Sequence, residues 1–276
     1  MESSGTIRES VAAGSFYPGN PNDLSIQINE FLDNAESSDI ESIKAIICPH
    51  AGYIYSGQVA AYSYRQIAGR KFDSVFLIAP SHSEYFDFVS IYSGDAYRTP
   101  LGLVHVDKER SKILADNSKG IRLSVYGHRD EHSLEVQLPF LQVLFKNIKM
   151  VPLVIGNQDN RNIKELGESI GSLFKNEKIL IIASTDLSHY HPYDTAVSLD
   201  QKVKKLIDSF DPEKLMTEFT SNNAEMCGGG PVISAMIASK ILGADTSKIL
   251  IYKNSGDVSG DRSAVVGYLA AALYKK

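Results

Sequence analysis

The stretch that decides the fold is Val75-Phe76-Leu77-Ile78-Ala79-Pro80-Ser81-His82, an unbroken apolar run that ends in a histidine. The run at 45–50 ends in His50 in the same way, and the run at 179–183 is followed shortly by His189. Continuous apolar runs are typical of parallel strands that are buried on both faces. Because ligands bind beyond the carboxyl ends of such strands, we expect the three histidines to converge on a metal or acid–base centre.

Other apolar runs alternate with helix-like segments along most of the chain. This alternation predicts one α/β domain over residues 1–276, with a central sheet flanked by helices. A run at 86–92 follows another strand without an intervening helix, so we expect the sheet to be mixed. The predicted strands are 43–48, 73–79, 86–92, 149–155, 178–184, 248–253 and 263–270. The predicted helices are 22–34, 57–68, 107–116, 133–146, 161–174, 196–207, 212–221 and 230–242.

The helix predicted at 133–146 has the clearest apolar stripe, with Leu134, Leu138 and Leu141 at helical spacing. Pro139 lies inside that stripe, and proline removes a helical hydrogen bond. We therefore expect this helix to be kinked or to begin later than its stripe indicates.

Composition excludes several classes of function. The chain has 276 residues and a net charge of −5; without a run of basic residues it lacks the footprint of a nucleic-acid-binding protein. No apolar run approaches the roughly 18 residues of a membrane span, and residues 1–6 do not resemble a signal peptide. The only cysteines are Cys48 and Cys227, which argues against a disulfide-stapled secreted protein and for a cytoplasmic location.

Cys227 immediately precedes a predicted helix, after the sequence Asn223-Ala224-Glu225-Met226 and before three glycines. The positive end of a helix favours the thiolate form of a cysteine. A thiolate beside two neutral imidazoles forms a His/His/Cys set suited to Fe(II), Cu or Zn. The alternatives are an inert buried cysteine and a glycine-rich phosphate cradle at the helix start.

Two further polar clusters contain candidate site residues. Asp186 and His189 are spaced to meet on one helical turn, where the carboxylate would orient a general base; local capping by Asp186 is the alternative. Glu131, His132 and Glu135 lie at the head of the helix predicted at 133–146. They are candidate hydrogen-bond partners of metal ligands, or simply the capped start of a helix.

Several of these segments together resemble one known family. They are Ala13-Gly14-Ser15-Phe16-Tyr17-Pro18, Cys48-Pro49-His50-Ala51-Gly52-Tyr53-Ile54-Tyr55-Ser56-Gly57, Ala79-Pro80-Ser81-His82, Glu131-His132-Ser133-Leu134-Glu135-Val136-Gln137-Leu138-Pro139, Ser184-Thr185-Asp186-Leu187-Ser188-His189 and the segment around Cys227. In this order, over nearly the whole chain, they resemble the MEMO family. That family is similar in fold to class III, LigB-type extradiol dioxygenases.

The resemblance implies a role for each of these residues. His50 and His82 match metal-ligand histidines, and Cys227 takes the place of a dioxygenase glutamate. His189 matches the general base, with Asp186 beside it. Tyr55 and Phe16 match aromatic residues that line the substrate pocket, although many family members have Trp where this chain has Phe16.

The chemistry implied is that of a mononuclear Fe(II) centre, with Cu or Zn as alternatives, acting in redox or oxygenase-type reactions. A thiolate donates more charge than a carboxylate and can itself oxidise, so dioxygenase activity does not follow from the fold. Two other functions are consistent with the same pocket: a non-catalytic protein that binds a small molecule or peptide, as animal relatives bind phosphotyrosine peptides, and a zinc hydrolase. The resemblance also implies a functional link to a radical SAM protein.

Overall fold

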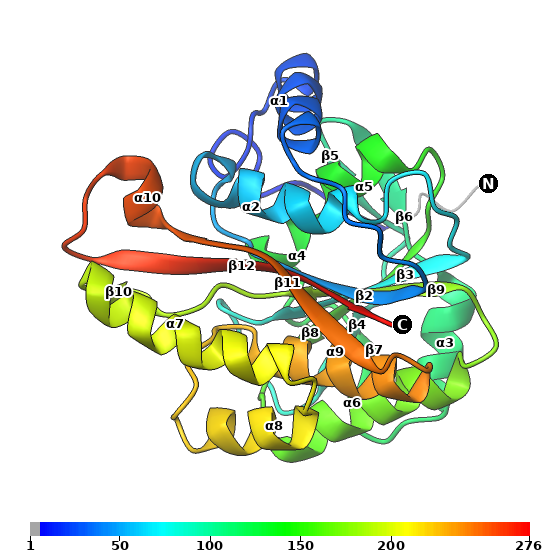
Figure 1. Ribbon diagram of the computed structural model, residues 1–276. Coiled ribbons are helices and arrows are strands. Elements are labelled where there is room, and N and C mark those ends of the chain that lie inside the picture. Colours follow the sequence, from blue (N-terminus) through cyan, green and yellow to red (C-terminus); the bar gives the residue numbers. More distant parts are fainter. Residues whose placement is uncertain (1–5) are drawn as a thin grey trace.

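A nine-stranded mixed sheet forms the centre of the computed structural model, which describes residues 6–276 (Figure 1). Its strand order is β10-β12-β2-β9-β3-β8-β4-β7, and β11 pairs with β12. The predicted α/β domain with a mixed sheet is therefore confirmed. The expectation of no signal peptide rests largely on residues 1–5, which lie outside the described residues.

The middle of this sheet is parallel, and an antiparallel pair joins it to the strands on each side. The parallel strands are β2 (Ile43–Cys48), β9 (Ile179–Ser184), β3 (Ser74–Pro80) and β8 (Met150–Ile155). Antiparallel pairing of β12 with β2 and of β4 with β8 makes the sheet mixed, as the sequence predicted. The remaining strands are β4 (Val89–Tyr92), β7 (Ile121–Ser124), β10 (His189–His191), β11 (Thr246–Asn254) and β12 (Val265–Tyr274).

Helices cover both faces of the sheet, which explains why its central strands are apolar throughout. Along β2, Ile46 packs into one core and Ile47 into the other. The helices on the Ile46 face are α1 (Pro21–Asp33), α2 (Tyr53–Arg65), α4 (His132–Glu135) and α5 (Leu138–Leu144), drawn above the sheet in Figure 1. Those on the Ile47 face are α3 (Lys108–Asp116), α6 (Asn160–Leu173), α7 (Tyr193–Asp208), α8 (Pro212–Thr220) and α9 (Gly229–Ile241). Within residues 6–276, none of the helices has the length and apolar character needed to cross a membrane.

Short elements account for most of what the sequence analysis missed. A separate three-stranded sheet contains β1 (Ile7–Arg8), β5 (Ala96–Thr99) and β6 (Gly102–His105). The helix α10 (Ser255–Ser259) is only five residues long. Segments this short contain too few residues to establish a periodicity.

The helix predicted at 133–146 is two helices. α4 ends at Glu135, and α5 begins at Leu138 with Pro139 in its first turn. Proline is tolerated there because the first helical N–H groups have no partner within the helix. The break leaves α4 as a single short turn that begins with His132.

Three adjacent strands end together at one edge of the sheet. They are β2, β9 and β3, in that spatial order. Two residues beyond their last residues lie His50, Asp186 and His82, respectively. The parallel arrangement thus delivers two imidazoles and a carboxyl group to the same edge.

Candidate metal centre

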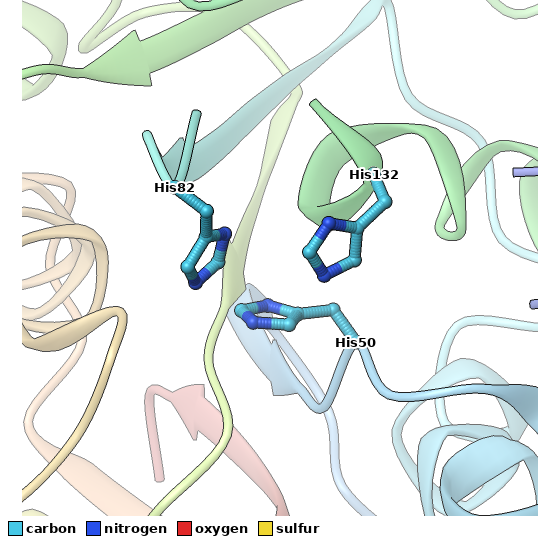
Figure 2. A group of neighbouring side chains, drawn as sticks. All are labelled: His50, His82 and His132. Atoms are coloured by element: carbon cyan, nitrogen blue, oxygen red, sulfur yellow. The ribbon is translucent and has the colours of Figure 1, made fainter. Parts of the chain in front are cut away.

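Three histidines meet at this edge of the sheet. His50, His82 and His132 each offer a ring nitrogen, and these nitrogens all lie within 4.8 Å of one another. Figure 2 shows the three rings turned toward a common space, each from a different part of the chain. His132 had been expected to support the metal ligands; the structure places it in the cluster itself.

The buried ring of His50 is held in a defined tautomer. Its Nδ1 lies 2.9 Å from Ser184 Oγ, and Ser184 donates its only hydroxyl proton to the carbonyl oxygen of Ser133. Ser184 must therefore accept a hydrogen bond from Nδ1–H of His50. This leaves the lone pair on Nε2, the nitrogen nearer Cys227, free to bind a metal ion.

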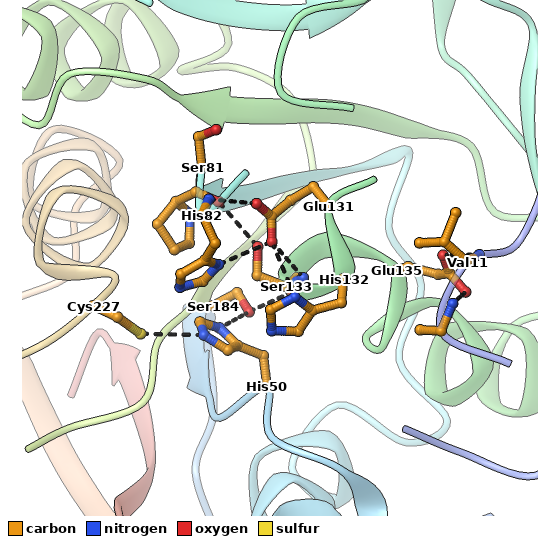
Figure 3. Close-up of polar contacts among 12 residues, drawn as sticks. Val11, His50, Ser81, His82, Glu131, His132, Ser133, Glu135, Ser184 and Cys227 are labelled. Atoms are coloured by element: carbon orange, nitrogen blue, oxygen red, sulfur yellow. Dashed lines mark hydrogen bonds and ion pairs between the residues drawn. The ribbon is translucent and has the colours of Figure 1, made fainter. Parts of the chain in front are cut away.

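A carboxylate orients His82. Glu131 Oε1 accepts a hydrogen bond from Nδ1–H of His82 at 2.9 Å, and Oε2 accepts one from its backbone N–H at 2.5 Å (Figure 3). Burial raises the pKa of Glu131, but the hydrogen bonds and charge of His82 outweigh it and lower that pKa to about 2. The same contact raises the pKa of His82 against the effect of its own burial. The pair has the carboxylate–histidine arrangement found beside many metal ions.

The ring of His132 packs against two other rings. Its ring centroid lies 4.4 Å from that of Phe16 and 5.0 Å from that of His82. Burial lowers the pKa of His132, which favours the neutral form that metal binding requires. Phe16 therefore packs against one imidazole of the cluster.

Glu135 was expected to support a metal ligand, but it binds the N-terminal segment instead. Among the described residues its carboxylate accepts hydrogen bonds from the N-terminal segment and from none of the clustered histidines. The donors are Arg8, the hydroxyl groups of Ser10 and Tyr17, and the backbone N–H groups of Val11 and Ala12. Glu135 thus fixes the segment that carries Phe16.

Cys227 contacts the cluster through one histidine. Its Sγ lies 3.1 Å from His50 Nε2 and accepts a hydrogen bond from the backbone N–H of Asp186 at 3.2 Å. Among the described residues, the group whose ligand atoms all lie within 4.8 Å of one another contains the three histidines and not Cys227. The expected lowering of its thiol pKa by the α9 N-terminus is absent, because burial, aided by the charge of Asp186, raises that pKa.

Asp186 and His189 do not share a helical turn, because residues 185–188 form an irregular link between β9 and β10. Asp186 Oδ1 accepts the backbone N–H of His50 at 2.8 Å, and burial raises the pKa of Asp186 to about 7. The backbone N–H of His189 donates to Glu225 Oε1 at 2.9 Å, and burial lowers the pKa of the His189 ring. Tyr55 lies in the first turn of α2, 41% exposed.

Sequence reasoning missed three residues that position the site. Ser184 fixes the His50 tautomer, Gln137 donates to Ser184 Oγ at 3.0 Å, and Glu225 contacts both His189 and His191. Gln137 and Ser184 are buried polar residues inside apolar segments. A polar residue inside an apolar segment was the available signal, because a buried polar group needs a hydrogen-bond partner.

Comparison with known proteins shows the family to which this chain belongs. The family model for Memo-like proteins matches residues 8–272. The chain belongs to the MEMO family. A MEMO1 family protein of Methanosarcina barkeri is 39% identical, with 96% of this chain and 98% of the relative covered. One from Nitrosopumilus maritimus is 38% identical over 95% of this chain and 98% of the relative.

A solved structure agrees at the level of fold. An uncharacterized protein of Escherichia coli K12 superposes with a TM-score of 0.56 and 15% sequence identity, over 83% of this MEMO-family chain and 99% of that protein. At this identity the likeness concerns the architecture alone.

The donor set fits a transition-metal ion. The orienting contacts of His50 and His82 engage Nδ1 of each ring, so Nε2 is the nitrogen that each would offer to a metal ion. Imidazole is a good ligand for Fe, Cu and Zn. Cys227 adds a sulfur donor in contact with His50. A bound cation would oppose the raised pKa of this thiol, because coordination to a metal deprotonates it.

Proposed function

We propose that this MEMO-family protein binds one transition-metal ion through His50 and His82 and uses it in redox or oxygenase-type chemistry. Fe(II) is the proposed metal, with Cu and Zn as the alternatives to test. The observation that carries the proposal is the convergence of three imidazoles, two of them oriented by hydrogen bonds, at the carboxyl ends of parallel strands. When bound, Fe(II) or Cu would supply the redox step.

We propose Cys227 as the third ligand, and His132 is the alternative. Cys227 Sγ already contacts the free nitrogen of His50, and its loop is fastened by a hydrogen bond from Gln158 to the Cys227 carbonyl at 2.7 Å. His132 has the better spacing to both other histidines. A sulfur ligand would make the site softer and favour Cu(I) relative to three imidazoles.

Proton transfer at the site is assigned to Asp186 and His189. The Asp186 carboxyl, with a pKa of about 7, exchanges a proton near neutral pH. His189 is half-buried, and its lowered pKa keeps the ring neutral and able to accept a proton.

The test is anaerobic titration of metal-free protein with Fe(II), Cu(I) and Zn(II). We expect stoichiometric binding by the wild type, loss of binding in His82→Ala, and affinity at least tenfold weaker in Cys227→Ala. His105→Ala, which changes an exposed histidine of β6, is the matched control. A larger loss in His132→Ala than in Cys227→Ala would make His132 the third ligand. Unchanged binding in His82→Ala would contradict the proposal.

A ligand-binding function without catalysis is the second candidate. The contact of Phe16 with His132 favours it, because the Phe16 ring presents an aromatic surface beside the site. Oxygen consumption with bound Fe(II) or Cu would separate redox catalysis from binding alone. Hydrolysis that persists with Zn(II) in the absence of oxygen would instead identify a zinc hydrolase.

A further inference from the structure

A cavity lies at the opposite end of the parallel strands, where β2 and β9 begin. It has a volume of about 310 Å³, and Ile43, Lys44, Lys178 and Ile179 contribute to its wall. These residues start the strands that end beside His50 and Asp186. A strand of six residues spans roughly 20 Å at about 3.3 Å per residue, so the cavity is separate from the metal centre.

Positive charge dominates the cavity wall. Five basic residues line it, against a single acidic one, in a protein whose net charge is −5. The basic residues are Lys44, Arg70, Lys71, Lys175 and Lys178. The acidic residue, Glu177, is already paired with Arg110 at 2.6 Å. The excess of positive charge is therefore local, because the chain as a whole carries a net negative charge.

The lysines of this wall have no counter-ion in the described structure. None of the ion pairs found within residues 6–276 involves Lys44, Lys71, Lys175 or Lys178. The neighbouring Asp73 carboxylate accepts the backbone N–H of Lys178. Arg70 is directed to the carbonyl oxygens of Gln66 and Ile40. Like charges gathered around one cavity repel each other, and a bound anion would relieve that repulsion.

Apolar side chains also line the cavity. Ile43 and Ile179 are buried, while Phe72 and Leu242 are partly buried. A pocket that combines apolar side chains with a few charged groups is typical of small-molecule sites, and this volume is at the lower end of their range of about 300–1,000 Å³. The ligand that fits is small, multiply charged, and has an apolar or aromatic part.

We infer that this cavity binds a small organic phosphate of the size and charge of a nucleoside diphosphate. The lysines would contact the phosphate oxygens as point charges. The side chains of Phe72 and Leu242 would pack against the apolar part. This site is independent of the metal centre and of the function proposed for it.

The test is calorimetric titration of metal-free protein with ADP and with pyrophosphate at low ionic strength. We expect both to bind, ADP more tightly, because only ADP offers a ring to the apolar side chains of the lining. Lys71→Gln/Lys178→Gln should weaken binding about tenfold, since each exposed charge contributes up to about 1 kcal/mol. Lys119→Gln/Lys164→Gln removes the same charge from exposed positions outside the cavity and should bind like the wild type.

Either of two outcomes with these probes and double variants would overturn the inference. One is an equal loss of affinity in both double variants, which would mean that only net charge matters. The other is the absence of binding by either probe at millimolar concentration. A His82→Ala variant tests whether pyrophosphate binds through residual metal at the metal centre. It should retain the wild-type affinity for pyrophosphate. Loss of binding in that variant would assign the phosphate to the metal centre and contradict the inference.

Discussion

Glu131 shows how a single residue prepares a metal ligand. It is 1% exposed and accepts two hydrogen bonds from His82, one from the ring and one from the backbone. Glu131→Gln keeps the shape but replaces one acceptor oxygen by a donor, so the ring loses its fixed tautomer. We expect metal affinity to fall about 10- to 100-fold, measured by competition with a chelator. Glu218→Gln, on the surface beside Lys202, is the control and should not change it.

Ser184 acts on His50 through the same kind of contact. Ser184→Ala removes the acceptor for Nδ1–H, so we expect a mixture of tautomers in the ring and metal binding about tenfold weaker. Nitrogen NMR of labelled histidine in the metal-free protein measures the tautomer directly. A single Nε2-unprotonated tautomer in the variant would show that Ser184 does not set it.

At the scale of elements, the N-terminal segment is held to α4 by one buried ion pair. Glu135 is fully buried and Arg8 is 5% exposed, and the two are in contact. Glu135→Ala leaves the Arg8 charge buried without its partner, which we expect to lower the free energy of unfolding by about 3–5 kcal/mol. Urea denaturation measures the loss. The surface variant Glu9→Ala should change the unfolding free energy by less than about 1 kcal/mol.

The loop between α8 and α9 positions Cys227 through close packing of glycines. A Cβ on Gly228 would lie 2.2 Å from the carbonyl oxygen of Ser184, which is backbone in β9. Gly228→Ala should therefore displace the loop and cost about 1–3 kcal/mol of stability, together with part of the metal affinity. In Gly19→Ala the new Cβ meets its nearest atom at 3.6 Å, so this control should leave metal binding unchanged. Equal affinities in the two variants would contradict the prediction.

For the whole molecule, His128 makes stability depend on pH. Burial, aided by the charge of Arg8, lowers the pKa of His128 to about 3, whereas the unfolded chain has a histidine pKa near 6.5. As the pH falls through this window the unfolded state binds a proton that the folded state does not, so stability decreases. Thermal unfolding of His128→Gln should therefore depend less on pH between 7 and 5 than that of the wild type. His105→Gln changes an exposed histidine and should keep the wild-type slope.

Long buried elements were predictable because burial leaves a pattern in the sequence. Strands β2, β3, β8 and β9 are buried on both faces and read as continuous apolar runs. The strands β5, β6 and β7 are four residues each and partly exposed. Their pairing partners, rather than their own composition, make them strands, so they escaped prediction.

The sequence by itself determined that His50 and His82 share an edge, because each follows a strand of a parallel sheet. It also indicated that the helix predicted at 133–146 is kinked or begins later, because Pro139 acts on its own backbone; the break between Glu135 and Leu138 came from the structure. Only the tertiary structure decided that His132 joins the cluster and that Glu135 does not. The physical reason is that α4 is one short turn, whose direction is set by contacts with distant segments such as Arg8. Side chains that distant segments bring together at one edge of the sheet have no fixed spacing in the sequence, so their contact cannot be predicted from it.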